Sequence, residues 1–217
     1  MSKIAVILSG CGVYDGAEIH ESVITLLTLD RAGAEVTCAA PNIDQMHVVN
    51  HAVGEPSGGS RNVAVESSRI ARGPVVALDE LDVSAFDGIV FPGGFGAAKN
   101  LSDYAVKGPD MTVQPDVERV VSQALELGKP LCFLCIAPVI AAKLIPGARL
   151  TIGTDPGTAD HVRALGATHV DAPVQDFVVD ERHKLVTSAA YMLGPGIKDV
   201  AAGIEKAVGK LLEMAGN

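Results

Sequence analysis

Short runs of apolar residues alternate along the chain with longer segments in which apolar residues recur at helical spacing. Runs of this length predict buried strands, and their alternation with helices is typical of an α/β fold with a largely parallel sheet. The predicted strands cover residues 4–8, 35–40, 88–91, 131–134 and 149–152, the predicted helices cover residues 21–32, 62–70, 115–127, 159–165 and 197–214, and residues 177–187 predict a hairpin with a charged turn.

One long segment, residues 42–75, is irregular apart from its short helix. A connection of this length in a compact protein is usually functional. Its polar residues are interpreted first as solvated surface groups and second as parts of a lid over a site. The residues concerned are Asn50, His51, Arg69 and Arg72. We expect one domain, residues 1–217, with an insertion at about 42–75.

Composition and charge narrow the classes of function. The chain has 217 residues, 48% of them hydrophobic, which is enough for one core of mostly small aliphatic side chains. A net charge of -9 argues against nucleic acid and anionic membranes as partners. No apolar run approaches the roughly 18 residues that span a bilayer, and the first strand begins without a signal-peptide pattern. With four unevenly spaced cysteines, these features lead us to expect a cytoplasmic protein.

The candidate nucleophile is Cys135, which follows the apolar strand at 131–134 and precedes Pro138 at the start of a predicted helix. A thiol at such a strand-to-helix turn faces backbone N–H groups that stabilise its anion. A free cysteine in an apolar run is otherwise most often a small core residue. That second interpretation suits Cys132, inside the strand, and the turn position favours chemistry for Cys135.

Two other loops follow predicted strands and therefore end at the same edge of the sheet as Cys135. Gly93 and Gly94 follow the strand at 88–91 and offer bare backbone N–H groups. With the N–H of Ile136, that of Gly94 is a candidate oxyanion hole, and a plain tight turn is the alternative.

The first of these loops, residues 9–18, leads into a helix opened by Glu21. Glu21 is either a partner of the helix dipole or a carboxyl group bonded to the Cys135 sulfur, with Glu18 as a competitor for that role. Cys11 lies in the same loop, where packing is the favoured role and a second thiol near Cys135 the alternative. Cys132 and Cys135 have the spacing of a redox dithiol, but no second cysteine pair or histidine cluster indicates a zinc site.

Several motifs together resemble the ThiJ/PfpI superfamily and, within it, the ElbB-like branch. They are residues 88–94 (GIVFPGG), 8–21 (LSGCGVYDGAEIHE), 135–138 (CIAP), 150–155 (LTIGTD) and 187–193 (TSAAYML). The resemblance implies a three-layer sandwich of the class I glutamine amidotransferase-like, flavodoxin-like fold with a nucleophile elbow at Cys135. It also implies Cys135 as nucleophile, Glu21 as its carboxyl partner, Gly93, Gly94 and Ile136 around the oxyanion, a homodimer and no cofactor.

The chain departs from hydrolytic members of that fold in its histidines. The residue after Cys135 is Ile136, where the peptidases carry histidine, and residues 187–192 hold no His-x-Glu. Related members carry a histidine where this chain has Asp155, and His161 lies further along, so both are candidates for positions flanking the site. Without an imidazole base, amide hydrolysis lacks an acid for the leaving amine.

These observations lead to two hypotheses of different class. The first follows from the resemblance, since the ElbB-like branch is described as related to isoprenoid biosynthesis and has a glyoxalase assignment. It is a cofactor-independent glyoxalase of ElbB type that converts methylglyoxal or glyoxal to a 2-hydroxy acid through a hemithioacetal on Cys135, so that the expected partner is a small aldehyde. The second is a cysteine redox sensor or stress-response binding protein in which Glu21 stabilises oxidised Cys135. An amidotransferase-like hydrolase is the least favoured activity.

Overall fold

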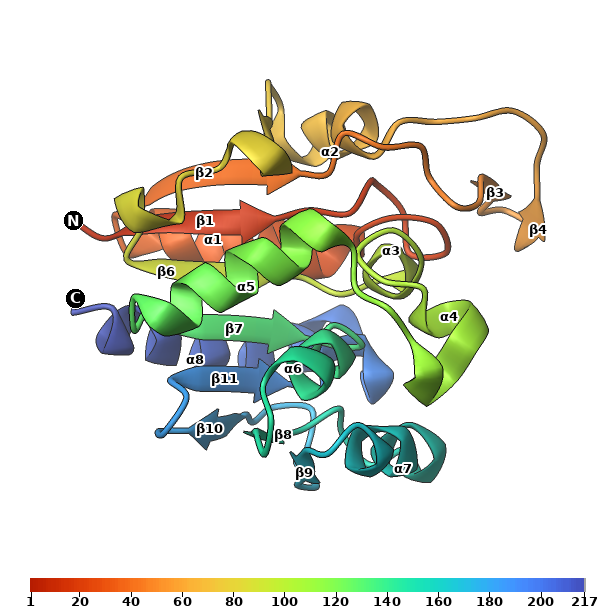
Figure 1. Cartoon of the computed structure of the whole chain (residues 1–217). Helices are drawn as coiled ribbons and strands as arrows, with labels where there is room; N and C mark the ends of the chain where they lie inside the picture. The colour runs from red at the N-terminus through yellow and green to blue at the C-terminus, as the bar shows by residue number, and fades with distance from the viewer. Residues whose placement is uncertain (217) are drawn as a thin grey trace.

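The centre of the molecule is a seven-stranded sheet with the strand order β10-β11-β7-β6-β1-β2-β5 (Figure 1). A computed structural model describes residues 1–216. The strands are β1 (Lys3–Ile7), β2 (Glu35–Ala40), β5 (Val76–Ala77), β6 (Gly88–Phe91), β7 (Leu131–Leu134), β10 (Val178–Asp180) and β11 (Leu185–Ser188). All neighbouring strands are parallel except β10, which pairs with β11 as an antiparallel hairpin.

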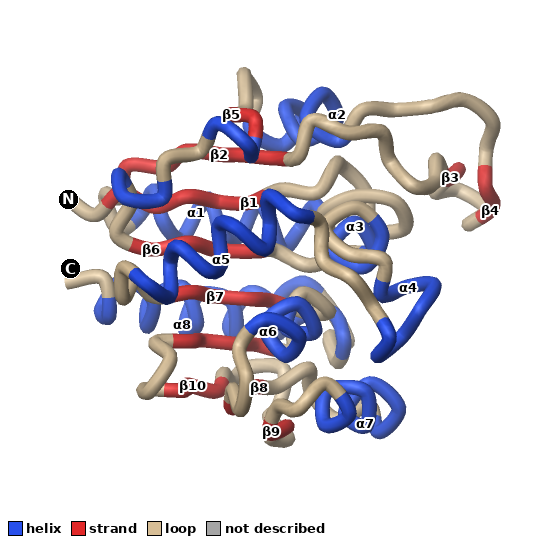
Figure 2. Tube along the Cα trace, viewed as in Figure 1, coloured by secondary structure: helices blue, strands red, loops and turns tan. Residues whose placement is uncertain are grey.

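Helices cover both faces of this sheet (Figures 1 and 2). The helices α1 (Ile19–Arg31), α2 (Val63–Ala71) and α8 (Ile197–Met214) pack on one face, and α5 (Pro115–Glu126) and α6 (Pro138–Leu144) pack on the other. The short helices α3 (Phe95–Lys99) and α4 (Tyr104–Lys107) and the helix α7 (Pro156–Ala164) lie beyond the carboxyl ends of the parallel strands. In residues 1–216 no helix is long and apolar enough to cross a membrane.

Two small pairs of strands lie outside the main sheet. β3 (Val49–Asn50) and β4 (Glu55–Pro56) form a hairpin that extends away from the body of the molecule (Figure 2). β8 (Arg149–Leu150) and β9 (Thr168–His169) pair in parallel on either side of α7 in the chain. Short 3-10 turns at Leu78–Glu80, Val83–Ala85, Gly108–Asp110 and Ala190–Met192 complete the described elements.

The strands are apolar on both faces because each face is covered by helices. In β7, Leu131 and Phe133 pack towards α5 and α6, whereas Cys132 and Leu134 pack towards α1 and α8. The rings of Phe91 and Phe133 stack in the first of these layers, with centroids 4.4 Å apart and planes inclined by 3°. Successive residues of a strand therefore alternate between two cores, one on each face of the sheet.

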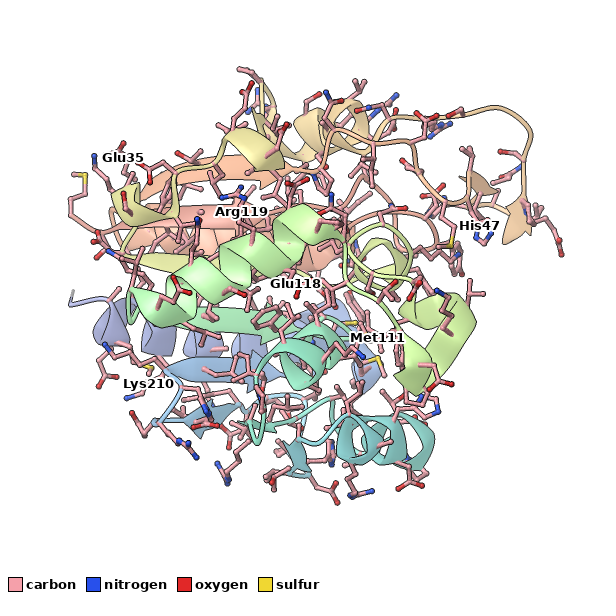
Figure 3. All side chains as sticks on the ribbon, in the orientation of Figure 1. Glu35, His47, Met111, Glu118, Arg119 and Lys210 are labelled. Carbon is pink, nitrogen blue, oxygen red and sulfur yellow. The ribbon has the colours of Figure 1, made fainter. Side chains whose placement is uncertain are left out.

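Polar contacts at the surface fix the outer helices. Arg119 of α5 donates hydrogen bonds to the backbone carbonyls of Leu78 and Leu81, which ties α5 to the turns before β6. Figure 3 labels Arg119 and the exposed Glu118 on this helix, and Met111, in the loop that leads into α5, is fully buried.

The predicted fold class, a three-layer sandwich with a mostly parallel sheet, is confirmed. Helix 197–214 has the predicted bounds, and α5 ends one residue before the predicted end. Two details differ. The predicted strand 149–152 shortens to β8 and pairs outside the main sheet, and α1 begins at Ile19 because Glu18 caps it. Segment 42–75, expected to be irregular, also contains the β3–β4 hairpin.

We predict that Phe133→Ala lowers the free energy of unfolding by about 3–5 kcal/mol, because it opens a void beside the stacked ring of Phe91. Urea unfolding followed by circular dichroism measures this loss. Phe95→Ala is the matched control: the Phe95 side chain is 46% exposed, so its removal is expected to cost less than about 1 kcal/mol. Equal losses in the two variants would contradict the assignment of the core.

Candidate active site

Cys135 occupies the sharp turn between β7 and α6. Its φ angle is 61°, in the left-handed region that non-glycine residues rarely adopt. The strained backbone is held because the Cys135 N–H donates to the carbonyl of Ser188 at 2.9 Å, which extends the pairing of β7 with β11. The predicted nucleophile elbow is therefore present, and the residue is 7% exposed at the floor of a cavity.

Glu21 lies beside Cys135 and is fully buried. One carboxylate oxygen accepts a hydrogen bond from the N–H of Gly93 at 2.8 Å, and the other accepts one from the N–H of Tyr191 at 3.2 Å. Gly93 packs against both the Cys135 side chain and this carboxyl group, and the interaction of the two groups lowers the pKa of Glu21 and raises that of the Cys135 thiol. The structure thus places Glu21, the predicted carboxyl partner, beside Cys135.

Glu18, and not Glu21, caps the first turn of α1. It is the N-cap of α1, and its Oε2 accepts a hydrogen bond from the N–H of Glu21 at 2.7 Å. Because Glu18 satisfies the start of the helix, Glu21 is free to point towards Cys135. The exposed His20 bonds through Nδ1 to the Tyr191 hydroxyl at 2.7 Å.

Burial dominates the proton affinities of the pair. Burial raises the pKa of Glu21 to about 7, and the negative charge of Glu18 adds to this effect. Burial also raises the pKa of the Cys135 thiol well above its usual range, with the Glu21 carboxylate as second cause. The expected resting thiolate is thus not favoured: the N–H groups of Gly94 and Ile136 at the sulfur lower its pKa, but by less than burial raises it.

The glycine loop after β6 approaches the pair so closely that side chains are excluded. A Cβ at Gly93 would clash with the Cβ of Cys135 and lie 2.7 Å from Oε2 of Glu21. Gly94 has a φ angle of 93°, and a Cβ there would clash with the backbone of Glu18. The predicted oxyanion residues Gly93, Gly94 and Ile136 thus surround Cys135, although the N–H of Gly93 is directed to Glu21.

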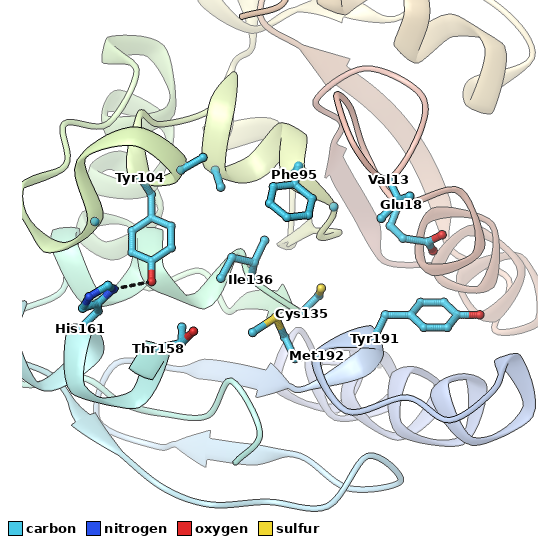
Figure 4. A pocket seen from close by; sticks show the side chains of 14 residues that line it. Val13, Glu18, Phe95, Tyr104, Cys135, Ile136, Thr158, His161, Tyr191 and Met192 are labelled. Atoms are coloured by element: carbon cyan, nitrogen blue, oxygen red, sulfur yellow. Dashed lines mark hydrogen bonds between the residues drawn. The ribbon is translucent and has the colours of Figure 1, made fainter. Parts of the chain in front are cut away.

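A cavity of about 560 Å³ opens above Cys135 (Figure 4). Most of its walls are apolar, and a few polar side chains interrupt them. Its apolar walls come from Val13, Phe95, Ala98, Ala105, Ile136 and Met192, its polar groups are Glu18, Tyr104, Thr158, His161 and Tyr191, and Gly94 and Gly108 complete the lining.

The structure separates the three residues predicted to flank the site. His161 lines the cavity, where its Nδ1 is 2.9 Å from the hydroxyl of Tyr104. Asp155 does not line it: this exposed residue caps α7 by accepting a hydrogen bond from the N–H of Thr158 at 2.7 Å. Cys11 is also absent from the lining and lies near Glu66 and Arg69 of α2, whose charges act on it.

No residue of segment 42–75 lines the cavity, so the lid interpretation is not supported. His51 instead accepts a hydrogen bond from the N–H of Tyr14 at 3.1 Å, and Arg69 pairs with Glu66 at 2.9 Å. Within the described part of the chain, no three His, Cys, Asp or Glu side chains gather where they would hold a metal ion.

Two residues that support the site had no separate signal in the sequence. Tyr191 donates its backbone N–H to Glu21, yet only its place in the motif at 187–193 marked it. Tyr104 lies on α4, a helix of four residues that is too short to give a periodic pattern. Its partner His161 was a candidate from the sequence, but the contact between Tyr104 and His161 joins helices that are distant in the sequence.

Comparison with known proteins assigns this arrangement to a family. Residues 3–195 match the model of the DJ-1/PfpI family, and the chain belongs to that family. This family is part of the superfamily that the motifs resembled.

Individual relatives match nearly the whole chain. The human glutamine amidotransferase-like class 1 domain-containing protein 3, mitochondrial, is 46% identical over 99% of this chain and 84% of its own length. The rat ES1 protein homolog, mitochondrial, is 47% identical over 99% and 85%. An isoprenoid biosynthesis protein with an amidotransferase-like domain from Ehrlichia chaffeensis has a similar crystal structure, with a TM-score of 0.93, 35% identity and 99% coverage of both chains.

The prediction of a cytoplasmic protein is wrong in the light of these relatives, because the human and rat proteins carry mitochondrial names. The physical reason is that targeting segments direct a protein to its compartment, so the core and the net charge of a folded domain do not predict localisation. A start in a strand and four free cysteines are compatible with any reducing compartment.

We predict that Glu21 destabilises the folded state as pH rises. Its pKa is about 7 when folded against an ordinary 4.5, so its favourable contribution is complete below pH about 4.5 and is lost as pH rises through about 7. The difference corresponds to roughly 3 kcal/mol. Urea unfolding of the wild type and of Glu21→Gln between pH 4 and pH 8 should therefore show the wild type losing about that much relative to the variant.

The control for this titration is Glu118→Gln, which neutralises an exposed glutamate on α5. Its stability should stay parallel to that of the wild type across the same pH range. A constant difference between the wild type and Glu21→Gln would show that Glu21 does not have the raised pKa.

Proposed function

We propose that the protein is a cofactor-independent glyoxalase that converts 2-oxoaldehydes to 2-hydroxy acids through a hemithioacetal on Cys135. The observation that carries this proposal is the direct pairing of a buried thiol with a buried carboxyl whose pKa is about 7. A group with that pKa can both accept and donate a proton at neutral pH, as an isomerisation of this kind requires.

The reaction begins with the transfer of the thiol proton of Cys135 to Glu21 while the sulfur attacks the aldehyde carbon. Because Glu21 lies beside the thiol and can take its proton during the attack, no resting thiolate is needed. The aldehyde oxygen takes up the proton, which gives a neutral hemithioacetal and leaves Glu21 ionised. The N–H groups of Gly94 and Ile136 lie beside the sulfur and are the donors available to the developing oxyanion.

The second stage moves a proton along the substrate. Ionised Glu21 removes the proton on the carbon that carries the sulfur and passes it to the neighbouring carbonyl oxygen, which forms an enediol. Glu21 then takes the proton of the hydroxyl group on the sulfur-bearing carbon and delivers it to the neighbouring carbon. The product is a 2-hydroxy thioester on Cys135, which water hydrolyses to the free acid and the thiol. The aldehyde carbon is oxidised and the adjacent carbonyl carbon is reduced, so the substrate itself balances the electrons.

The arrangement supports amide hydrolysis less well. Among the histidines of residues 1–216, only His161 lines the cavity, and its Nδ1 is engaged by Tyr104. In Figure 4 the side chain of Ile136 lies between His161 and Cys135. A cysteine–histidine pair of the kind that serves amidotransferases and peptidases is therefore not formed by these residues.

The redox-sensor alternative has weaker support for a related reason. Oxidation by peroxide depends on the fraction of resting thiolate. Burial and the Glu21 carboxylate both raise the pKa of Cys135, which reduces that fraction at neutral pH. Attack on a bound aldehyde differs because Glu21 can take the proton during the step.

We predict that Cys135→Ser lowers kcat/KM for methylglyoxal by at least about 1,000-fold, because the hydroxyl group is a much poorer nucleophile at this site. Lactate formation in a coupled assay measures the change. The control is Cys38→Ser, a half-buried thiol on β2 that should leave turnover within about twofold.

Retained turnover in Cys135→Ser would refute the glyoxalase proposal. If intact-mass measurement then found Cys135 oxidised selectively at low peroxide, the sensor function would replace it.

We also predict a pH dependence. The value of kcat/KM should rise with pH through about 7, because Glu21 must be ionised to take the thiol proton. In Glu21→Gln the activity should fall by about 100-fold or more, and the step near pH 7 should disappear. A step at the same pH in Glu21→Gln would assign it to another group.

A further inference from the structure

The cavity above Cys135 is much larger than glyoxal or methylglyoxal. At ~30 Å³ for each water-sized group, its volume of about 560 Å³ holds on the order of fifteen to twenty such groups. A three-carbon aldehyde attached to the sulfur would fill only about a quarter of it. Cavities of about 300–1,000 Å³ are typical of sites for small-molecule ligands larger than such an aldehyde.

The chemistry of the walls restricts what fills the remaining space. Phe95, Ile136 and Met192 present apolar surface, and burying apolar ligand area against them is favourable. Among the lining residues that the structure describes, none is lysine or arginine, whereas the carboxylate of Glu18 is present. An anionic ligand would therefore be buried without a counter-charge and close to a like charge.

One wall carries a polar cluster away from the sulfur. Tyr104 and His161 are hydrogen bonded at 2.9 Å, and the hydroxyl of Thr158 also interacts with Tyr104. Figure 4 shows this cluster on the opposite side of Ile136 from Cys135. The Tyr104–His161 bond uses one ring nitrogen, so the other nitrogen and the free lone pairs of the hydroxyl groups remain available to a ligand.

We propose that Tyr104, His161 and Thr158 bind a hydroxyl group at the far end of a neutral 2-oxoaldehyde whose apolar body, about the size of a phenyl ring, lies against Ile136 and Phe95. The aldehyde end then meets Cys135, and this part rests on the proposed glyoxalase function. Tyr104 and His161 are specificity-determining residues, since they contact the substrate at a distance from the reacting carbon.

A series of four aldehydes tests the proposal by steady-state kinetics: methylglyoxal, phenylglyoxal, 4-hydroxyphenylglyoxal and 4-carboxyphenylglyoxal. We expect kcat/KM for phenylglyoxal to exceed that for methylglyoxal at least about tenfold, after correction for hemithioacetal formation with a free thiol. The hydroxylated compound should be better again by about three- to tenfold, and the carboxylated compound at least about tenfold worse than the hydroxylated one.

The variant Tyr104→Phe tests the role of the hydroxyl group. It should remove the preference for 4-hydroxyphenylglyoxal over phenylglyoxal, chiefly through a higher KM and with little change in kcat. His161→Gln provides a second test should the first variant fold poorly. Tyr14→Phe is the matched control, because Tyr14 is exposed and outside the cavity, and it should keep the preference.

A binding measurement separates failure of this inference from failure of the glyoxalase proposal. The ketone 4-hydroxyacetophenone lacks the aldehyde, so calorimetric titration reports on the cavity alone. Tighter binding than acetophenone, lost in Tyr104→Phe and kept in Tyr14→Phe, supports the inference even if no aldehyde is turned over. Equal binding of the two ketones, or an aldehyde series led by methylglyoxal and dependent on Cys135, would overturn it and leave the glyoxalase proposal standing.

Discussion

The close pairing of the buried side chains of Glu21 and Cys135 is the interaction on which the arrangement of the site depends. A carboxyl group removed from water next to a thiol is costly unless backbone donors compensate. Four N–H groups do so here, two at the carboxylate and two at the sulfur, and they belong to Gly93, Tyr191, Gly94 and Ile136. These donors come from the segments that follow β6, β7 and β11, while Glu21 comes from α1, so four parts of the chain must converge at one edge of the sheet.

The loops after β1 and β6 can approach each other closely only with small residues at their contact and a rigid support. A side chain at Gly94 or Gly96 would meet the backbone around Gly16, so the loop after β6 can pack directly on the loop after β1. Asn100 holds the same two loops together, because its amide donates to the carbonyls of Ser9 and Asp15 at 2.8 and 2.9 Å. The glycines are thus needed for close approach, and the flexibility that glycine usually brings is removed by these contacts.

Much of the fold could be predicted because it follows from short-range patterns. The apolar run at 131–134 predicts a buried strand, and the helical periodicity of 197–214 predicts a helix, without information from elsewhere in the chain. The parallel topology then brings Cys135 and the glycine loop to one edge of the sheet. Glu21 could be named but not separated from Glu18, since capping geometry decides between them. The pKa of Cys135 was predicted in the wrong direction, because a turn position does not reveal the burial that dominates. The cavity walls at Tyr104 and His161 depend on contacts between short distant helices, for which no local pattern exists.

Direct titration of the Glu21 carboxyl group is the most immediate test of the account, because the proposed chemistry depends on a proton held between Glu21 and Cys135. Carbon-13 NMR of protein labelled at the glutamate carboxyl carbons resolves it, with the resonance assigned by its loss in Glu21→Gln. A midpoint near pH 7 that shifts in Cys135→Ser is the predicted result. A midpoint at or below 4.5, unaffected by Cys135→Ser, would contradict the shared proton and with it the role of Glu21 in catalysis.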